Sequence, residues 1–238
     1  MADADFETTF AETAVVDADP LLNAASIGAL ASLKASVRDG AKRLSDIVGA
    51  ILLAVVFAPL IIAIVVVIRH GGGDVFFPHE RVGLNGRSFR CYKFRTMVPD
   101  AEQRLKALLD SDSALAAEWQ EVRKLRNDPR ITPIGRFLRR TSLDELPQIW
   151  NVLVGEMSLV GPRPIVRDEL HRYGRNLGTY LGAKPGLTGL WQVTGRSDAS
   201  YRRRVAMDVY YARNRSLLLD LSILLKTVRV VVAGNGAY

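Results

Sequence analysis

A run of apolar residues from Ile47 to Ile68 constrains the fold of this chain more than any other feature. The run holds 22 residues without a charge and is interrupted only by Gly49 and Pro59. As a straight helix it would reach about 33 Å, enough to cross a bilayer core of about 30 Å. A soluble core helix of this length would normally carry polar side chains on one face, so the run predicts a membrane-embedded helix.

Two features complicate a simple span. Pro59 lies at the middle of the run, where it frees a backbone carbonyl and bends the helix. Lys42 and Arg43 precede the run and Arg69 follows it, so the positive-inside rule gives no orientation. Hydropathy alone favours a straight span, whereas a helix that enters and returns on one leaflet would satisfy both features.

The charge of the chain is unevenly divided. Residues 1–41 carry seven acidic and two basic residues, whereas residues 42–238 carry eighteen acidic and thirty basic ones. A basic body indicates a polyanionic partner, such as nucleic acid, anionic lipid or a phosphorylated substrate. The single Cys91 excludes an intramolecular disulfide and fits a reducing compartment. The acidic N-terminus shows no secretory signal.

These patterns predict an α+β fold that is mostly helical. We expect a disordered or loosely helical tail over 1–39, a membrane-embedded helix over 40–70 and a catalytic domain over 71–238. Asn85-Gly86 predicts a small β-hairpin between strands at 75–77 and 88–96, and 185–189 reads as a turn cluster. Further helices are expected over four ranges: 100–126, 165–180, 200–213 and 217–233.

Two adjacent carboxylates, Asp144 and Glu145, follow an Arg-Arg pair that begins at Arg139. Adjacent carboxylates can hold Mg²⁺ through oxygen, and an aspartate can attack phosphorus directly. A structural role is an equal alternative to the catalytic one, because Ser142 and Glu145 fit the S-x-x-E capping box of a helix. Such a helix would start near Asp144, which places Pro147 acceptably in its first turn.

Other basic residues are open to two interpretations. Lys93 and Arg95 share one strand face, which fits a phosphate site or a solvated sheet face. Arg163 stands between two prolines, which fits a structural corner or a positioned nucleotide contact. The run Arg202–Arg204 favours a basic face toward the membrane. The sequence contains no P-loop motif, no G-x-G-x-x-G and no Cys/His cluster. These absences disfavour P-loop, Rossmann and zinc chemistry.

Many of these segments, in the same order, resemble one family. The segments are Lys42-Arg43-x-x-Asp46, the apolar run with its central proline, Lys93-Phe94-Arg95-Thr96-Met97, Leu138 to Gln148, Gly161-Pro162-Arg163-Pro164, Lys184 to Gly189 and Asp208-Val209-Tyr210-Tyr211. Over residues 42–233 the chain resembles the bacterial sugar transferases, monotopic polyprenyl-phosphate hexose-1-phosphate transferases. Within them it is most similar to the rhizobial galactosyl-phosphate transferases that initiate exopolysaccharide synthesis.

The resemblance implies a reaction. A hexose 1-phosphate, with galactose expected before glucose, would pass from a UDP-hexose to undecaprenyl phosphate with release of UMP, beginning exopolysaccharide repeat-unit assembly. Asp144 would be the nucleophile that forms a covalent phosphosugar, and Glu145 would assist with Mg²⁺ or with the proton. Both carboxylates would then be metal ligands. The resemblance also implies five substrate-binding residues: Arg139 for phosphate, Arg163 on the nucleotide side, and Lys93, Arg95 and Asp208.

The resemblance further implies a location at the cytoplasmic face of the bacterial inner membrane. The family's re-entrant helix is broken by a Ser-Pro pair, where this chain has Ala58-Pro59. We expect a re-entrant helix, with further amphipathic helices lying at the membrane interface. The sequence leaves the oligomeric state open, with a homodimer as one option. A non-catalytic membrane scaffold of the polysaccharide machinery is the alternative function, and no nucleic-acid-binding motif is present.

Overall fold

A computed structural model describes residues 20–122, 125, 128–194 and 200–232 of the chain. The disorder expected of the first residues therefore lies outside the described part. The chain divides into two compact units, Met1–Lys42 and Arg43–Tyr238. In the first unit the structure describes the beginning of helix α1 (Pro20–His70). The expected boundaries at residues 39 and 70 stay a prediction.

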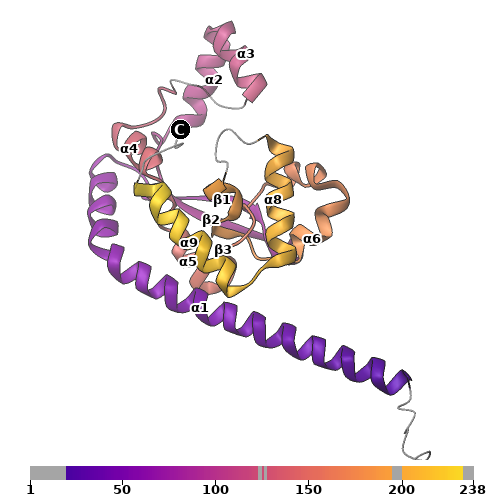
Figure 1. Ribbon diagram of the computed structural model, residues 1–238. Helices are drawn as coiled ribbons and strands as arrows, with labels where there is room; N and C mark the ends of the chain where they lie inside the picture. The colour runs from indigo at the N-terminus through magenta and orange to yellow at the C-terminus, as the bar shows by residue number, and fades with distance from the viewer. Residues whose placement is uncertain (1–19, 123–124, 126–127, 195–199, 233–238) are drawn as a thin grey trace, which may run out of the picture. The chain divides into compact units, whose positions relative to one another are not determined.

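Helix α1 contains the apolar run. From Ser36 to His70 it is long and apolar enough to cross a membrane, by length and composition. Only 11% of its most apolar 18-residue stretch is buried inside the protein, whereas the core helix of a soluble protein is mostly buried. Figure 1 shows α1 changing direction sharply in its C-terminal part. Pro59 lies inside the helix, and an internal proline is the usual cause of such a bend.

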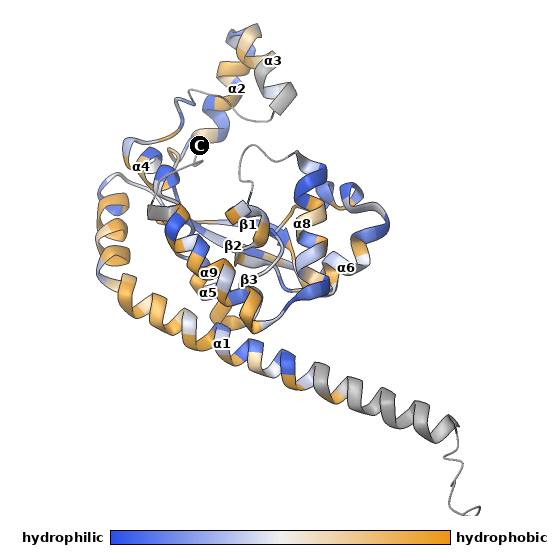
Figure 2. Cartoon of the chain, in the orientation of Figure 1, coloured by the Kyte–Doolittle hydropathy of each residue, from blue (hydrophilic) through white to orange (hydrophobic). Residues whose placement is uncertain are grey.

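Within the second unit, α1 packs at two separate places. On the N-terminal side of Pro59, Ala50 joins a buried cluster with Val152 and Met157. On the C-terminal side, Ile64 and Ile68 join a second cluster with Phe94 and Leu138. Figure 2 shows predominantly apolar colouring over the C-terminal part of this helix. One stripe of α1 therefore covers the core, and the rest of its apolar surface is exposed.

The expected β-hairpin is present. Strands β1 (Phe76–Val82) and β2 (Ser88–Phe94) pair antiparallel, with Phe77 opposite Lys93. The turn η1 (Leu84–Gly86) holds Asn85 at φ 57° and Gly86 at φ 77°, the left-handed region that an Asn-Gly turn supplies. The first strand extends further toward the turn than the sequence predicted.

A second sheet was not expected. Strands β3 (Ser158–Val160) and β4 (Gly186–Thr188) pair in parallel, so the prediction of only a turn at 185–189 was wrong. Local patterning gives no signal for two three-residue strands that find each other across the chain. The pairing fixes the Gly161-Pro162-Arg163-Pro164 corner, which follows β3 directly.

The helical predictions were partly correct. Asp112 separates α2 (Ala101–Ser111) from α3 (Ser113–Val122), because its carboxylate accepts backbone N–H bonds from Ala114 and Leu115 and caps a new helix. The expected helix at 165–180 is a 3₁₀ segment, η3 (Arg167–Asn176), followed by α6 (Leu177–Leu181). Helices α8 (Tyr201–Asn214) and α9 (Leu217–Val232) are confirmed. The remaining short helical segments are α4 (Pro133–Thr141), η2 (Leu143–Glu145), α5 (Gln148–Val154) and α7 (Leu190–Thr194).

Candidate active site

The paired carboxylates lie on a tight connection and not in a capped helix. Ser142 ends α4 in the left-handed conformation (φ 58°, ψ 15°), and its side chain makes no cap hydrogen bond. Asp144 and Glu145 form the single turn η2, and the next helix begins only at Gln148, after Pro147. The capping-box interpretation was therefore wrong. The left-handed residue reverses the chain and places both carboxylates beside β2.

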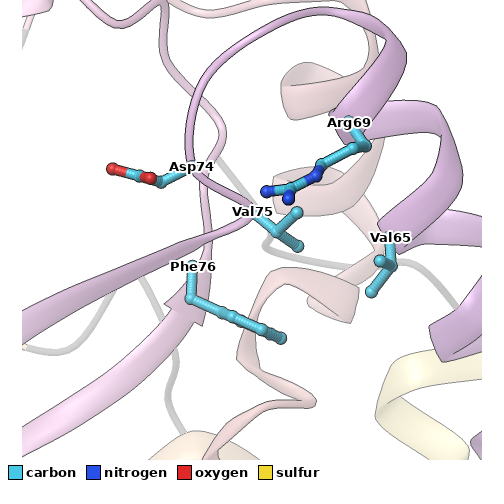
Figure 3. A pocket seen from close by; sticks show the side chains of 5 residues that line it. All are labelled: Val65, Arg69, Asp74, Val75 and Phe76. Carbon is cyan, nitrogen blue, oxygen red and sulfur yellow. The ribbon is translucent and has the colours of Figure 1, made fainter.

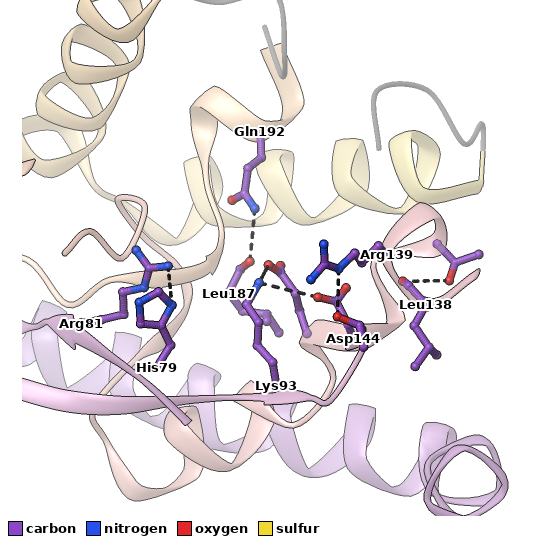
Figure 4. Close-up of polar contacts among 11 residues, drawn as sticks. His79, Arg81, Lys93, Leu138, Arg139, Asp144, Leu187 and Gln192 are labelled. Atoms are coloured by element: carbon purple, nitrogen blue, oxygen red, sulfur yellow. Dashed lines mark hydrogen bonds and ion pairs between the residues drawn. The ribbon is translucent and has the colours of Figure 1, made fainter. Parts of the chain in front are cut away.

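Lys93 of β2 contacts both carboxylates. Its Nζ lies 2.6 Å from Glu145 Oε1 and 3.7 Å from Asp144 Oδ2. Figure 4 shows the Asp144 carboxylate between the Lys93 ammonium and Arg139. Asn151 fixes this arrangement, because its buried amide accepts from the Tyr92 N–H and donates to the Arg90 carbonyl. Helix α5 and strand β2 are thereby held together next to η2.

Arg139 reaches the site from the last turn of α4. Thr132 caps this helix by accepting from the Gly135 N–H at 3.0 Å. A side chain at Gly135 would overlap the backbone of Thr96, so glycine is what lets α4 approach β2 so closely. The Arg139 Nε then donates to Thr96 Oγ1 at 2.9 Å, which leaves the rest of the guanidinium beside Asp144.

The ionisation of this cluster is shared among its members. Burial raises the pKa of Asp144, the Lys93 ammonium opposes that rise, Glu145 reinforces it and Arg139 opposes it. Burial also disfavours the charge on Lys93, but Glu145 and Asp144 outweigh this effect and raise its pKa. One ammonium thus balances two neighbouring negative groups, and loss of its charge would protonate Asp144 more readily.

The carboxylate pair has the right chemistry for Mg²⁺. Among the described residues, no group of three or more His, Cys, Asp or Glu side chains is placed to hold a metal. Asp144 and Glu145 offer two adjacent oxygen donors, which already lie against one cation, Lys93. Mg²⁺ in phosphate-transferring sites is commonly held by one or two carboxylates together with substrate phosphates and water. The residues therefore fit this ion.

Arg163 and Asp208 lie together on the other side of Glu145. A cavity is lined by Arg163 together with Arg81, Lys93, Glu145 and Gln192. Asp208 is almost fully buried and accepts from the Tyr173 hydroxyl at 2.8 Å and the Arg163 N–H at 3.4 Å. Burial raises its pKa from 3.8 to about 7, against the effect of these hydrogen bonds. Asp208 positions the backbone of Arg163 and does not line the cavity.

Arg95 lies apart from the carboxylates. Its guanidinium forms an ion pair with the exposed Asp74 at 3.0 Å. Asp74 borders an open pocket of about 520 Å³ at the end of α1, together with Arg69 and three apolar side chains, Val65, Val75 and Phe76 (Figure 3). The five predicted substrate-binding residues thus divide into three places. Lys93 and Arg139 flank Asp144, Arg163 donates its backbone N–H to Asp208, and Arg95 pairs with Asp74, which lines the α1 pocket.

Sequence reasoning missed two side chains near the cavity. Gln192 of α7 lines it and donates to the Leu187 carbonyl at 3.5 Å (Figure 4). Its neighbour Trp191 is buried and lies against two guanidinium groups. A single tryptophan in a short segment carries no local signal of a site, because its contacts come from residues distant in sequence.

Comparison with known proteins shows the family of this chain. The family model described as "Bacterial sugar transferase" matches residues 37–234. The chain is 52% identical over 197 residues to the "Undecaprenyl-phosphate galactose phosphotransferase" of Salmonella typhimurium, covering 83% of this chain and 41% of that protein. It is 51% identical to the "UDP-galactose-lipid carrier transferase" of Erwinia amylovora, with 83% and 41% covered.

A third relative is covered more fully. The chain is 47% identical over 199 residues to the "Exopolysaccharide production protein ExoY" of Rhizobium meliloti, covering 83% of this chain and 88% of that protein. The chain spans about two fifths of the first two relatives. The family model covers most of this chain, and the alignment with the ExoY protein covers 88% of the ExoY protein. This chain therefore belongs to the bacterial sugar transferase family.

Proposed function

We propose that the protein transfers a hexose 1-phosphate, with galactose preferred, from a UDP-hexose to undecaprenyl phosphate and releases UMP. The single observation that carries this proposal is the buried Asp144 carboxylate between Lys93 and Arg139. A carboxylate flanked by two cations can approach an anionic diphosphate, because the cations offset the repulsion. The names of the curated relatives support a galactosyl phosphate and a polyprenyl acceptor.

The transfer takes place in two displacements at the same phosphorus. A carboxylate oxygen of Asp144 attacks the sugar-bearing phosphorus, and the bond from that phosphorus to the bridging oxygen breaks. UMP leaves with the electron pair. A phosphate oxygen of the lipid then attacks the same phosphorus, breaks its bond to Asp144 and restores the carboxylate. Arg139 stabilises charge on the transferred phosphoryl group.

Glu145 holds Lys93 in place through the 2.6 Å contact. When bound at Asp144 and Glu145, Mg²⁺ would neutralise phosphate charge as a Lewis acid. Lys93 is the residue that contacts both carboxylates, so we assign it the role of keeping Asp144 ionised and correctly oriented.

We place this reaction at the cytoplasmic face of the inner membrane. The apolar run packs within the second unit on both sides of Pro59, Ala50 in one cluster and Ile64 in the other. A helix that crossed the bilayer would carry one end about 30 Å from the domain, so this packing supports a re-entrant helix. Helix α9 adds exposed apolar side chains, among them Leu218 at 81% and Leu225 at 65% exposure, as an interfacial helix requires.

The α1 pocket is the best place for the acceptor to approach. Its apolar side chains come partly from the membrane helix, and Arg69 adds a positive charge beside them (Figure 3). A polyprenyl phosphate combines an apolar chain with an anionic head, so both kinds of side chain have a partner. Arg95, held by Asp74 at the rim of this pocket, would then serve the acceptor and not the donor.

The test is a release assay for UMP with detergent-solubilised full-length protein, undecaprenyl phosphate and Mg²⁺. UDP-galactose and UDP-glucose are compared as donors. Asp144→Asn is expected to lower turnover at least about 10³-fold, because the nucleophile is lost. The control is Asp168→Asn, an exposed carboxylate in η3, which should leave turnover unchanged. Full turnover by Asp144→Asn would refute the nucleophile, and absence of UMP release by the wild type would favour the scaffold.

A further inference from the structure

Trp191 of α7 stacks against two arginines from different parts of the chain. The guanidinium carbon of Arg163 lies 5.2 Å from the centre of its ring, and that of Arg204 lies 4.4 Å from it. Arg204 also lies 5.6 Å from the ring of Tyr201, one turn earlier on α8. Trp191 itself is only 7% exposed. We call Arg163, Trp191 and Arg204 the arginine–tryptophan cradle.

The run 202–204 therefore does not form a uniform basic face. Arg202 and Arg203 are exposed, whereas Arg204 is half-buried and packs inward on the aromatic rings. The expectation of a membrane-facing basic face was wrong for Arg204. Its position is a consequence of α8 packing against α7, which no local pattern in three consecutive arginines could show.

The two positive charges of the cradle have no direct counter-ion in the described part of the chain. Neither guanidinium forms an ion pair with a described carboxylate, and the Nε groups of both are buried without a hydrogen-bond partner. The Trp191 Nε1 is likewise buried without a hydrogen-bond partner among the described residues. Asp208 is close, but its hydrogen bonds go to the Tyr173 hydroxyl and to the backbone N–H of Arg163.

The charges of this arrangement are only partly compensated within the described part of the chain. Burial lowers the pKa of Arg204 and the neighbouring Arg163 lowers it further, while Tyr201, Asp208 and Glu169 oppose this lowering without reversing it. Stacking on an aromatic ring compensates only part of the cost of placing two like charges in a partly desolvated site. All three cradle side chains are hydrogen-bond donors and none is an acceptor. The ligand that completes such a site is rich in acceptor oxygens and negatively charged, as a phosphate is.

The cradle opens on the candidate active site. Arg163 lines the same cavity as Lys93 and Glu145, and Gln192, the residue after Trp191, lines it too. Arg139 approaches Asp144 from the α4 side. A diphosphate that presents its sugar-bearing phosphorus to Asp144 would therefore have its second phosphate toward Arg163.

We propose that the arginine–tryptophan cradle binds the nucleotide phosphate of the donor, the group that departs as UMP. This inference rests on the proposed function. It assigns binding roles to Trp191 and Arg204, which the sequence did not single out for the nucleotide. Positive charge at this phosphate stabilises both the bound donor and the leaving group, so Arg204 acts on donor binding and on the first chemical step, and leaves acceptor binding unaffected.

The experiment measures the binding of UMP to full-length protein in detergent by titration calorimetry. Arg204→Gln is expected to weaken UMP binding about 10-fold to 100-fold, the worth of a charge-assisted contact. The matched control is Arg203→Gln, which removes the same charge one residue earlier on the same helix, at an exposed position. This control should stay within about 2-fold of the wild type, because exposed charges are screened.

Two further variants separate the contribution of the indole N–H from that of the aromatic face, and the contribution of the guanidinium shape from that of its charge. Trp191→Phe keeps an aromatic face but replaces the indole by a smaller ring without the N–H, and Arg204→Lys keeps the charge but loses the planar fork. Both should bind UMP more weakly than wild type, and Arg204→Lys should keep the unfolding temperature of the ligand-free protein, whereas Trp191→Phe lowers it because a smaller ring leaves a cavity. If Arg204→Gln fails to fold, Arg204→Lys decides, and UMP binding at wild-type strength by a folded Arg204 variant would overturn the cradle.

The source of the phosphate is tested separately with inorganic phosphate and dodecyl phosphate. If the cradle holds the nucleotide phosphate, Arg204→Gln raises the donor KM and weakens the binding of UMP, while the binding of dodecyl phosphate stays unchanged. A loss confined to dodecyl phosphate would assign the cradle to the lipid acceptor and overturn the nucleotide proposal. A wild type that binds UMP but does not release it from a UDP-hexose would refute the proposed function and leave the cradle standing.

Discussion

At the scale of single residues, the state of Asp144 depends on Lys93. Burial raises the pKa of Asp144 and the Lys93 ammonium holds the rise back. The ammonium contacts Glu145 more closely, at 2.6 Å, than Asp144, at 3.7 Å. Glu145 thus positions the lysine, and the lysine keeps the adjacent aspartate charged. In the reaction proposed above the Asp144 carboxylate attacks as the ionised form, so we assign both side chains the role of preparing it.

Lys93→Met should move the acid limb of the pH profile. Without the ammonium, the pKa of Asp144 rises further, so the fraction of ionised nucleophile falls at a given pH. We expect the acid limb of kcat/KM for UMP release to shift to higher pH, with a lower plateau. The control is Lys106→Met on α2, an exposed lysine. A lower plateau with an unmoved acid limb would contradict this role for Lys93.

At the scale of elements, the site depends on how closely α4 approaches β2. The Thr132 N–H donates to the Thr96 carbonyl at 3.0 Å, and Arg139 reaches the Thr96 hydroxyl from the same helix. Gly135 faces the Thr96 backbone with no room for a side chain. The two elements therefore meet backbone to backbone, and this contact sets the position of Arg139.

Gly135→Ala should damage both stability and activity. The added methyl group meets backbone atoms of Thr96 that cannot rotate away, so α4 must shift and carry Arg139 with it. We expect a loss of about 1–3 kcal/mol in the free energy of unfolding, together with a raised donor KM. The control is Gly178→Ala in α6, where nothing lies within 4 Å of the new methyl group. Denaturant unfolding and UMP release measure the two effects, and equal behaviour of both variants would contradict the close-approach argument.

At the scale of the second unit, the start of the apolar run is tied to α5 and β3. Arg43, before the apolar run, donates to the Val152 and Leu153 carbonyls at 2.6 and 2.7 Å. Asp46 is buried and accepts from the Ser158 hydroxyl and the Leu159 N–H, each at 3.0 Å. These contacts hold the start of the run against α5 and β3.

Thiol labelling should place both flanks of the apolar run on one side of the membrane. Ser36→Cys lies before the apolar run and Ser113→Cys lies in α3, and both serines are exposed. In a Cys91→Ala background, a membrane-impermeant reagent is expected to label both positions in inverted vesicles and neither in intact spheroplasts. The Cys91→Ala protein alone gives the unlabelled baseline. Labelling of the two positions from opposite sides would establish a straight span in place of the re-entrant helix.

The sequence by itself determined the features that depend on neighbouring residues. An uncharged run of 22 residues predicts a long apolar helix, Asn85-Gly86 predicts a hairpin, and Asp144 beside Glu145 predicts carboxylate chemistry. Each of these signals is local, because backbone propensity and hydropathy act over a few turns of chain. The same locality misled the capping interpretation, since Ser142 and Glu145 have the right spacing but the wrong backbone conformation.

Only the tertiary structure decided which distant side chains meet. Lys93 contacts Glu145 across 52 positions in the sequence, and Asp208 reaches Arg163 across 45. The parallel pairing of β3 with β4 and the stacking of Arg204 on Trp191 are of the same kind. Such contacts form when apolar faces pack and bring polar groups along with them, so their partners are set by the geometry of the whole core and not by any one segment.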